Sequence, residues 1–264
     1  MVKSIYVGPK ELQGIEKTSA NHLIVWSGDL DEESWQDLQK LGLNLSIALN
    51  FLDKGEDRCV LDPEIQSRFF RNLEFALQLH PQEVWIDRFR FGGDCTGISD
   101  ADAKLAHQEC PFCQGKNRTL ELIKLVETIK RKIAGRSKFG LFTIAFKDDE
   151  SAKLGEVLGL DYQRLGQIVD IFSPMLYHRM LGKSESYISE YTSWLAERCS
   201  KPVLPIIQIK DMPDDLEDKM TEDDIKAATL EAVKPPSSGV SVFWWHHALE
   251  KNKAGIVSKL LASI

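Results

Sequence analysis

The regular alternation of short apolar segments with segments of helical periodicity is the strongest constraint on the fold. Eight segments rich in β-branched, aromatic or other apolar residues are predicted to be strands, at 4–8, 22–28, 43–51, 83–91, 138–146, 169–177, 202–210 and 240–246. Between most of them apolar residues recur three or four apart, as from Leu120 to Ile133, where Thr119 is the predicted N-cap. Strands separated by single helices are expected to pair in parallel.

This pattern and the chain length of 264 residues predict a single (β/α)8 TIM barrel that spans residues 1–264 as one domain. An open, doubly wound α/β sheet is the alternative. That fold ordinarily carries a glycine-rich turn after its first strand, and "VGPKELQG" matches such a turn poorly. No linker rich in Pro, Gly or Ser divides the chain.

Charge and hydropathy exclude several classes of partner. The 33 basic and 40 acidic residues give a net charge of -7, and the basic residues are scattered, which argues against binding to nucleic acid or to an anionic membrane. No apolar run approaches the roughly 20 residues that a membrane span needs. The N-terminus lacks the apolar region of a secretory signal, so we expect a cytoplasmic protein.

An acid and two arginines end the fourth predicted strand, in "EVWIDRFRFGG". Active sites of such barrels lie at the C-terminal ends of the strands, so Asp87 is a candidate for chemistry, with Arg88 or Arg90 as its ionic partner. Asp87 and Arg90 are three residues apart and would face opposite sides of a regular strand, so both can reach one pocket only if the strand ends or bulges between them. The alternative is a structural ion pair.

Residues 87–91, "DRFRF", resemble the Asp-aromatic-aliphatic-Arg-aromatic strand of an uncharacterised superfamily of glycoside-hydrolase-like (β/α)8 barrels, distantly related to α-amylases and α-galactosidases. "SPMLY" at 173–177 is similar to their sixth strand, "PIIQ" at 205–208 to their seventh, and "FWW" at 243–245 fills the place of the aromatic last strand. The chain departs from the pattern at Arg88, where relatives carry an aromatic residue, and at Ile207, where they often carry Trp.

The resemblance implies hydrolysis of a glycosidic bond, which generally needs two carboxyl groups. Asp87 is predicted to be catalytic, acting as the nucleophile because an adjacent arginine would keep it ionised, and Arg90 is assigned to the same catalytic group. Asp148 is the first candidate for the second carboxylate. Three other acids also follow predicted strands: Asp29, Asp53 and Asp211.

Four further side chains near strand ends are predicted to bind substrate. Tyr177, His178 and Gln208 offer hydrogen-bonding groups, and Trp244 offers a flat face to a sugar ring. Alternation allows only one of Trp244 and Trp245 to line the pocket. The alternative for these residues is core packing with a satisfied polar tip.

The connection after the fourth strand, residues 92–118, is far longer than an ordinary βα loop. We expect a structural zinc to hold it, and its potential ligands are Cys95, His107, Cys110 and Cys113. A Cys110–Cys113 redox pair and plain free thiols are the alternatives. Cys59 and Cys199 are isolated in the sequence and are expected to be buried as small apolar side chains.

The leading functional prediction is therefore a glycoside hydrolase that acts on a carbohydrate without an organic cofactor. The alternative is a barrel without the second carboxylate, which binds a carbohydrate or acts as a scaffold. A metal-dependent hydrolase fits less well, because the first strands contain no His-x-His pair.

Overall fold

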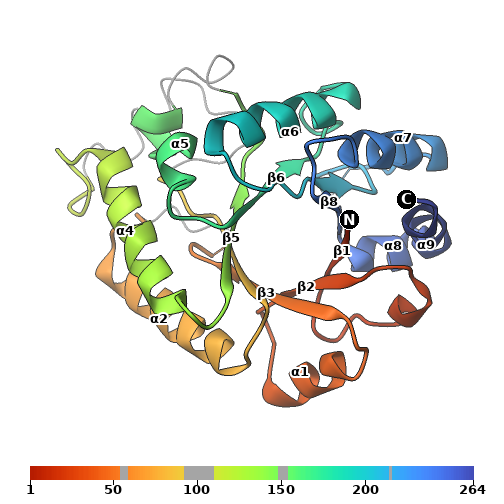
Figure 1. Cartoon of the computed structure of the whole chain (residues 1–264), viewed down its shortest axis with the longest axis horizontal. Coiled ribbons are helices and arrows are strands. Elements are labelled where there is room, and N and C mark those ends of the chain that lie inside the picture. The colour runs from red at the N-terminus through yellow and green to blue at the C-terminus, as the bar shows by residue number, and fades with distance from the viewer. Residues whose placement is uncertain (54–58, 92–109, 148–153, 214–215) are drawn as a thin grey trace.

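The computed structural model describes residues 1–53, 59–91, 110–147, 154–213 and 216–264. Eight strands form a closed barrel in the order of the sequence, every neighbouring pair is parallel, and β8 returns to β1 (Figure 1). The predicted (β/α)8 barrel is confirmed. The strands are β1 (Val2–Val7), β2 (His22–Trp26), β3 (Asn44–Asn50), β4 (Glu83–Asp87), β5 (Lys138–Thr143), β6 (Ile171–Leu176), β7 (Ile206–Gln208) and β8 (Gly239–Phe243).

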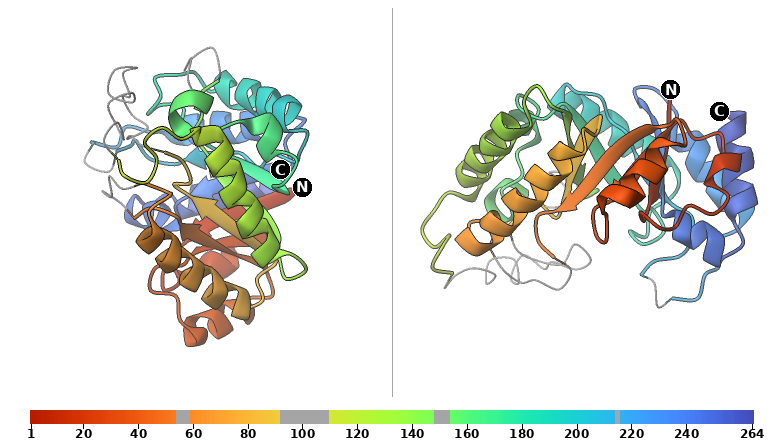
Figure 2. Two further views of the ribbon diagram at one scale, coloured as in Figure 1. Left: turned by 90° about the vertical axis from the view of Figure 1, so that its left-hand side faces the viewer. Right: turned by 90° about the horizontal axis from the view of Figure 1, so that it is seen from below.

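Helices surround this barrel, and the two ends of the chain lie side by side (Figure 2). Lys3 ties them together, because its Nζ donates to the carbonyl oxygen of Leu261 at 2.7 Å. No helix of the described ranges is long and apolar enough to cross a membrane. The helices are α1 (Glu32–Gln39), α2 (Pro63–Gln78), α4 (Arg118–Ile133), α5 (Tyr162–Leu165), α6 (Ser186–Cys199), α7 (Glu222–Ala232), α8 (Trp245–Glu250) and α9 (Ala254–Ser263), with a 3-10 turn at Ile15–Lys17 and a π-helical turn at Leu154–Leu158.

Polar side chains start several helices. Thr221 caps α7 in a reciprocal capping box with Asp224. The predicted cap of α4 is wrong: Asn117 is the N-cap and accepts the backbone N–H of Leu120 at 3.0 Å. Thr119 lies inside the first turn, and its hydroxyl donates to the carbonyl of Gly155 instead.

The centre of the barrel is filled by Trp85 of β4, which is fully buried and stacks on Phe142 of β5 with ring centroids 5.2 Å apart. Gly140 of β5 makes room for it, because a Cβ at that position would lie 2.3 Å from two ring carbons of Trp85. The indole Nε1 donates to Glu83 Oε2 at 2.9 Å. The tryptophan therefore closes the barrel interior between its two ends.

The N-terminal end of the barrel holds a polar cluster. His22 Nε2 lies 2.7 Å from Ser46 Oγ, and the Ser46 hydroxyl donates to Glu83 Oε2 at 3.3 Å. Burial lowers the pKa of His22, and this effect exceeds the opposite influence of Glu83, so the imidazole is held neutral. These groups satisfy one another at the end of the barrel that is associated with stability.

Asp170, which precedes β6, also lies at this end. Its carboxylate accepts Lys130 Nζ at 2.6 Å and the backbone N–H of Phe139 at 2.8 Å. The residue thus joins α4 to the start of β5, which agrees with the structural role expected for an acid that precedes its strand.

Candidate active site at the C-terminal mouth of the barrel

Asp87 is the last residue of β4 and lies at the C-terminal mouth of the barrel. The strand stops there because Arg88 adopts a left-handed conformation, with φ of 54°. This turn brings the backbone N–H of Arg88 to the carboxylate of its own neighbour, where it donates to Asp87 Oδ1 at 2.6 Å. The side chain of Asp87 keeps partial access to solvent.

The left-handed conformation of Arg88 ends the strand between Asp87 and Arg90, which is the condition under which both side chains can reach one pocket. Strand alternation ends at Asp87, and both Arg90 and Arg88 act electrostatically on its carboxylate. Arg88 extends toward the loop after β3, where its Nη1 donates to the carbonyl of Asp53 at 3.1 Å. Phe89 is buried on the other side, against the ring of Phe51. The strand therefore ends in charged residues because its last turn faces the mouth.

Opposing influences act on the pKa of Asp87. Burial raises it, and this effect outweighs the Arg88 N–H and the charges of Arg90 and Arg88, which lower it. The predicted influence of the arginines is therefore present but is not the largest one, and the role of Asp87 as a nucleophile stays a prediction. A carboxyl group with a raised pKa is suited to donate a proton.

Aromatic rings form one wall beside Asp87. Tyr6 of β1 is central to it, with ring centroids 5.3 Å from Phe243, 6.0 Å from Trp244 and 6.4 Å from Trp26. Tyr177 joins the same wall through Phe243, at 5.2 Å. Trp26, Phe243 and Trp244 are only partly buried and so remain accessible from the mouth.

Tyr6 is a member of this site that sequence reasoning missed. Burial is the main influence that raises its pKa well above the ordinary value, and the nearby Asp87 and Tyr177 raise it further. The phenol is therefore neutral beside the carboxyl group. Its position near the C-terminal end of the first strand is the signal that could have identified it, since active sites of such barrels lie at those strand ends.

Trp244 packs against Tyr6 and Phe243, and its binding to a substrate stays a prediction, whereas Trp245 is fully buried at the start of α8 and donates its Nε1 to the carbonyl of Gln13 at 3.1 Å. Asn50 is a second residue that the sequence did not suggest. It is the register partner of Asp87 on β3, and its Oδ1 is buried without a hydrogen bond among the described residues. The mouth therefore offers an amide oxygen next to the carboxyl group.

Two of the predicted substrate-binding residues are buried and differ in their hydrogen bonds. Gln208 is fully buried, its Nε2 donates to the carbonyl of Lys210 at 2.7 Å, and its Oε1 accepts the backbone N–H of Arg179 at 3.2 Å, so it holds the loop between β6 and α6. His178 is buried with Nε2 3.7 Å from Glu185, neither ring nitrogen has a hydrogen bond among the described residues, and burial lowers its pKa. Binding of either residue to a substrate stays a prediction.

The candidates for a second carboxylate differ in their surroundings. Asp148, the first candidate, lies outside the described residues. Asp211 is bound by Arg179, with Nε to Oδ1 at 2.6 Å, and this ion pair holds its pKa below the ordinary value. Asp53 is exposed and forms an ion pair with Arg68 at 3.1 Å. Asp29 is exposed in the turn after β2. Asp211 is therefore a poor proton donor.

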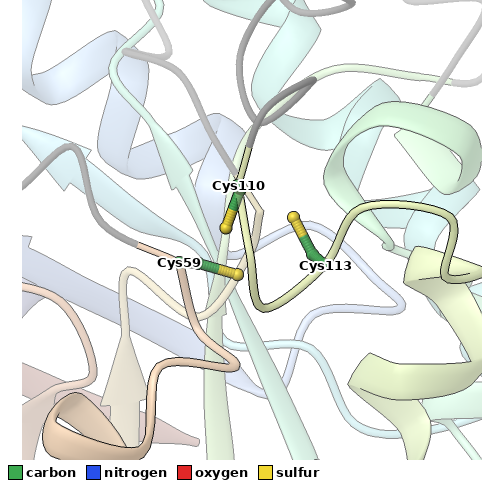
Figure 3. A group of neighbouring side chains, drawn as sticks. All are labelled: Cys59, Cys110 and Cys113. Carbon is green, nitrogen blue, oxygen red and sulfur yellow. The ribbon is translucent and has the colours of Figure 1, made fainter.

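A cluster of three thiols lies in the loops that follow β3 and β4. The Sγ atoms of Cys59, Cys110 and Cys113 all lie within 4.8 Å of one another and point together (Figure 3). Cys110 and Cys113 were predicted as ligands, whereas Cys95 and His107 lie outside the described residues. Cys59 is buried, as expected, but the expectation that it only fills apolar space is wrong, because it faces two other thiols.

No family model matches the chain, and no curated protein sequence matches it. Solved structures do share its fold. The glycoside hydrolase domain of PgaB (BpsB) from Bordetella bronchiseptica superposes with a TM-score of 0.71 at 11% identity over 99% of each chain. A class V chitinase from Pseudomonas fluorescens Pf-5 gives 0.64 at 11% identity over 98% of each chain. A GH18 chitinase from Pseudoalteromonas aurantia gives 0.62 at 11% identity over 98% of this chain and 100% of the other.

These neighbours are a glycoside hydrolase domain and two chitinases, and their likeness to this chain is one of fold. The (β/α)8 barrel that the strand motifs predict is thereby confirmed. A particular kinship to α-amylases finds no support in them.

Proposed function

We propose that the protein is a glycoside hydrolase that binds a carbohydrate at the C-terminal mouth of its barrel and cleaves it with the carboxyl group of Asp87. The observation that carries the proposal is the raised pKa of Asp87 at the end of β4, next to a wall of accessible aromatic rings. A carboxyl group with a raised pKa is better suited to donate a proton to a glycosidic oxygen, and aromatic faces suit the apolar face of a sugar ring.

In the proposed reaction Asp87 is the general acid. Its proton passes to the oxygen of the leaving sugar as the bond from that oxygen to the anomeric carbon breaks. Water then attacks the anomeric carbon and gives its proton to a second carboxylate, for which Asp148 is our candidate. Asp87 regains its proton from solvent through the mouth, because its side chain is partly accessible.

A second route needs only one protein carboxyl group. Two of the reported neighbours are chitinases, and in substrate-assisted hydrolysis the acetamido group of an N-acetylated sugar replaces the protein nucleophile. We therefore include N-acetylglucosamine oligosaccharides among the first substrates to be tested.

The test compares wild-type protein with Asp87→Asn on a panel of oligosaccharides, with products followed by mass spectrometry. The variant is expected to lose turnover while it keeps its far-UV circular dichroism and its affinity for the oligosaccharide. Asp37→Asn is the matched control, because Asp37 is an exposed carboxylate on α1 and is not among the candidates for the second carboxylate. Normal turnover in Asp87→Asn would remove Asp87 from the mechanism.

Arg90→Met separates an electrostatic role from a structural one. The charge of Arg90 lowers the pKa of Asp87, so its removal is expected to move the alkaline limb of the kcat/KM profile to higher pH. A loss of activity without any shift of that limb would mean that Arg90 supports only the fold.

A carbohydrate-binding or scaffolding barrel is the second candidate. It is favoured by the state of the other acids: Asp211 is held in an ion pair, and Asp53 is exposed and bound to Arg68. Oligosaccharide binding by the wild-type protein without turnover of any member of the panel would support this candidate over the enzyme.

A further inference from the structure

Three cysteines from two separate loops converge beside the mouth of the barrel. Cys59 lies between β3 and α2, and Cys110 and Cys113 lie between β4 and α4. Cys59 and Cys113 are almost completely buried, and Cys110 is partly exposed (Figure 3). Two βα loops thus meet at their sulfur atoms.

The spacing of these sulfur atoms suits a tetrahedral ion. With Zn–S bonds of about 2.3 Å, the sulfur atoms of a tetrahedral site lie about 3.8 Å apart. The three Sγ atoms already lie within 4.8 Å of one another, so a movement of about 1 Å or less would complete the geometry. Among the soft ligands that proteins offer, thiolates favour zinc over magnesium or calcium.

Backbone amides around the thiols support the charged form that a metal needs. The N–H groups of Phe112 and Cys113 donate to the Cys110 sulfur, and together with the neighbouring thiols they lower its pKa although burial raises it. The N–H of Leu61 donates to Cys59 Sγ at 3.4 Å. Burial raises the pKa of Cys59 and of Cys113, and the charge of Arg118 lowers that of Cys113. A cation bound among the three sulfur atoms would further stabilise the thiolate form that burial disfavours.

The surrounding backbone fixes the Cys-Pro-Phe-Cys turn. The N–H of Gln114 donates to the carbonyl of Cys110 at 3.0 Å, and the N–H of Lys116 donates to the carbonyl of Cys113 at 3.1 Å. Both thiols of the turn are thereby directed toward Cys59 before any ion binds. A disulfide would use only two of the three sulfur atoms and leaves the position of the third unexplained.

We propose that Cys59, Cys110 and Cys113 bind one structural Zn2+ that joins the loop after β3 to the loop after β4. Binding releases the three thiol protons and forms three Zn–S bonds, which leaves one position of a tetrahedral zinc for a further ligand. The ion does not take part in bond cleavage. The proposal adds a metal site to the proposed glycosidase and does not depend on it.

The position of this site gives the ion a role near Asp87. The loop after β3 begins against the catalytic strand, where the N–H of Phe51 donates to the carbonyl of Asp87 and the carbonyl of Asp53 accepts Arg88. The same loop arrives at Cys59 before α2 begins. A metal that fixes Cys59 to the Cys110–Cys113 turn therefore anchors both loops that flank Asp87.

The first measurement is the metal content of the full chain, purified under reducing conditions without chelator and analysed by plasma mass spectrometry. About one equivalent of zinc is expected in the wild-type protein. Cys59→Ser and Cys110→Ser are expected to lower it at least about tenfold, and Cys110→Ser is the milder change because Cys110 is partly exposed. Cys199→Ser is the matched control: Cys199 is buried and far from the cluster, so its replacement should leave the zinc content unchanged.

A second measurement guards against variants that fail to fold. Wild-type protein is stripped of metal and reloaded with Co2+, which should give an intense thiolate-to-cobalt charge-transfer band in the near ultraviolet. Three results would overturn the proposal: wild-type protein without zinc and without that band, Cys110→Ser protein that keeps the wild-type zinc content, or an intact mass lower by two hydrogens that shows a disulfide within the cluster. None of these readouts requires hydrolytic activity, so the metal site and the glycosidase can fail separately.

Discussion

Replacement of Gly140 by alanine should destabilise the barrel strongly. The new methyl group would lie 2.3 Å from Cδ2 and Cε3 of Trp85 and 2.7 Å from Cε2, whereas non-bonded carbon atoms ordinarily lie about 3.5–4.0 Å apart. The indole must therefore move by more than about 1 Å inside a filled barrel. Overpacking of this kind costs about 1–3 kcal/mol.

The displaced ring would also lose its hydrogen bond to Glu83, now 2.9 Å long. A hydrogen bond to a charged group contributes about 1.5–3 kcal/mol. The two effects together predict a loss of about 2.5–6 kcal/mol in the free energy of unfolding. At about 3 kcal/mol the melting temperature of a domain of this size falls by about 6–12 °C.

Urea unfolding followed by tryptophan fluorescence and circular dichroism measures this loss. Gly255→Ala is the control, because a Cβ at Gly255 in α9 meets nothing within 4 Å and should leave stability unchanged or raise it by up to about 1 kcal/mol. Trp85→Leu in the Gly140→Ala background should cost less than Trp85→Leu alone, because it relieves the collision. A loss below about 1 kcal/mol for Gly140→Ala would show that Trp85 does not occupy the centre of the barrel as described.

Two other predictions concern carboxyl groups at opposite ends of the barrel. The folded state raises the pKa of Asp87, so the stabilising contribution of this group is complete below its unfolded pKa and is lost as the pH rises through its folded pKa. Urea unfolding from acid to neutral pH should therefore show wild-type protein losing stability relative to Asp87→Asn. A difference in stability that stays constant with pH would contradict the burial argument. Asp170→Ala should lower the free energy of unfolding by about 2 kcal/mol in the same assay, because it removes the ionic partner of Lys130. Turnover should stay unchanged. An undiminished free energy of unfolding would show that the ion pair is energetically neutral.

Much of the fold was predictable because its signals are local. Apolar strands and helical periodicity follow from side-chain spacing alone, and the position of Asp87 at a strand end follows from the order of the segments. The start of α4 was missed because Asn117 and Thr119 are both capping residues, and only the backbone conformation decides between them.

The composition of the site was less predictable because it depends on distances between strands. Tyr6 and Cys59 are far in sequence from Asp87 and from Cys110, and only the closure of the barrel and the path of its loops bring them together. The pKa of Asp87 depends on a balance between burial and two arginine charges. A sequence shows that the charges are adjacent, but it does not show how far the carboxyl group is removed from water.

The two acids of β4 differ in role: Glu83 supports the fold, and Asp87 is the proposed catalytic group. Glu83 and Asp87 are four residues apart and face the barrel interior on either side of Trp85. Glu83 accepts the Trp85 indole and the Ser46 hydroxyl, so the protein itself satisfies it. Asp87 accepts the backbone N–H of Arg88, the charges of Arg90 and Arg88 act on it, and burial still raises its pKa. Asp87 thus lies at the open mouth, where in the proposed reaction a substrate oxygen accepts its proton.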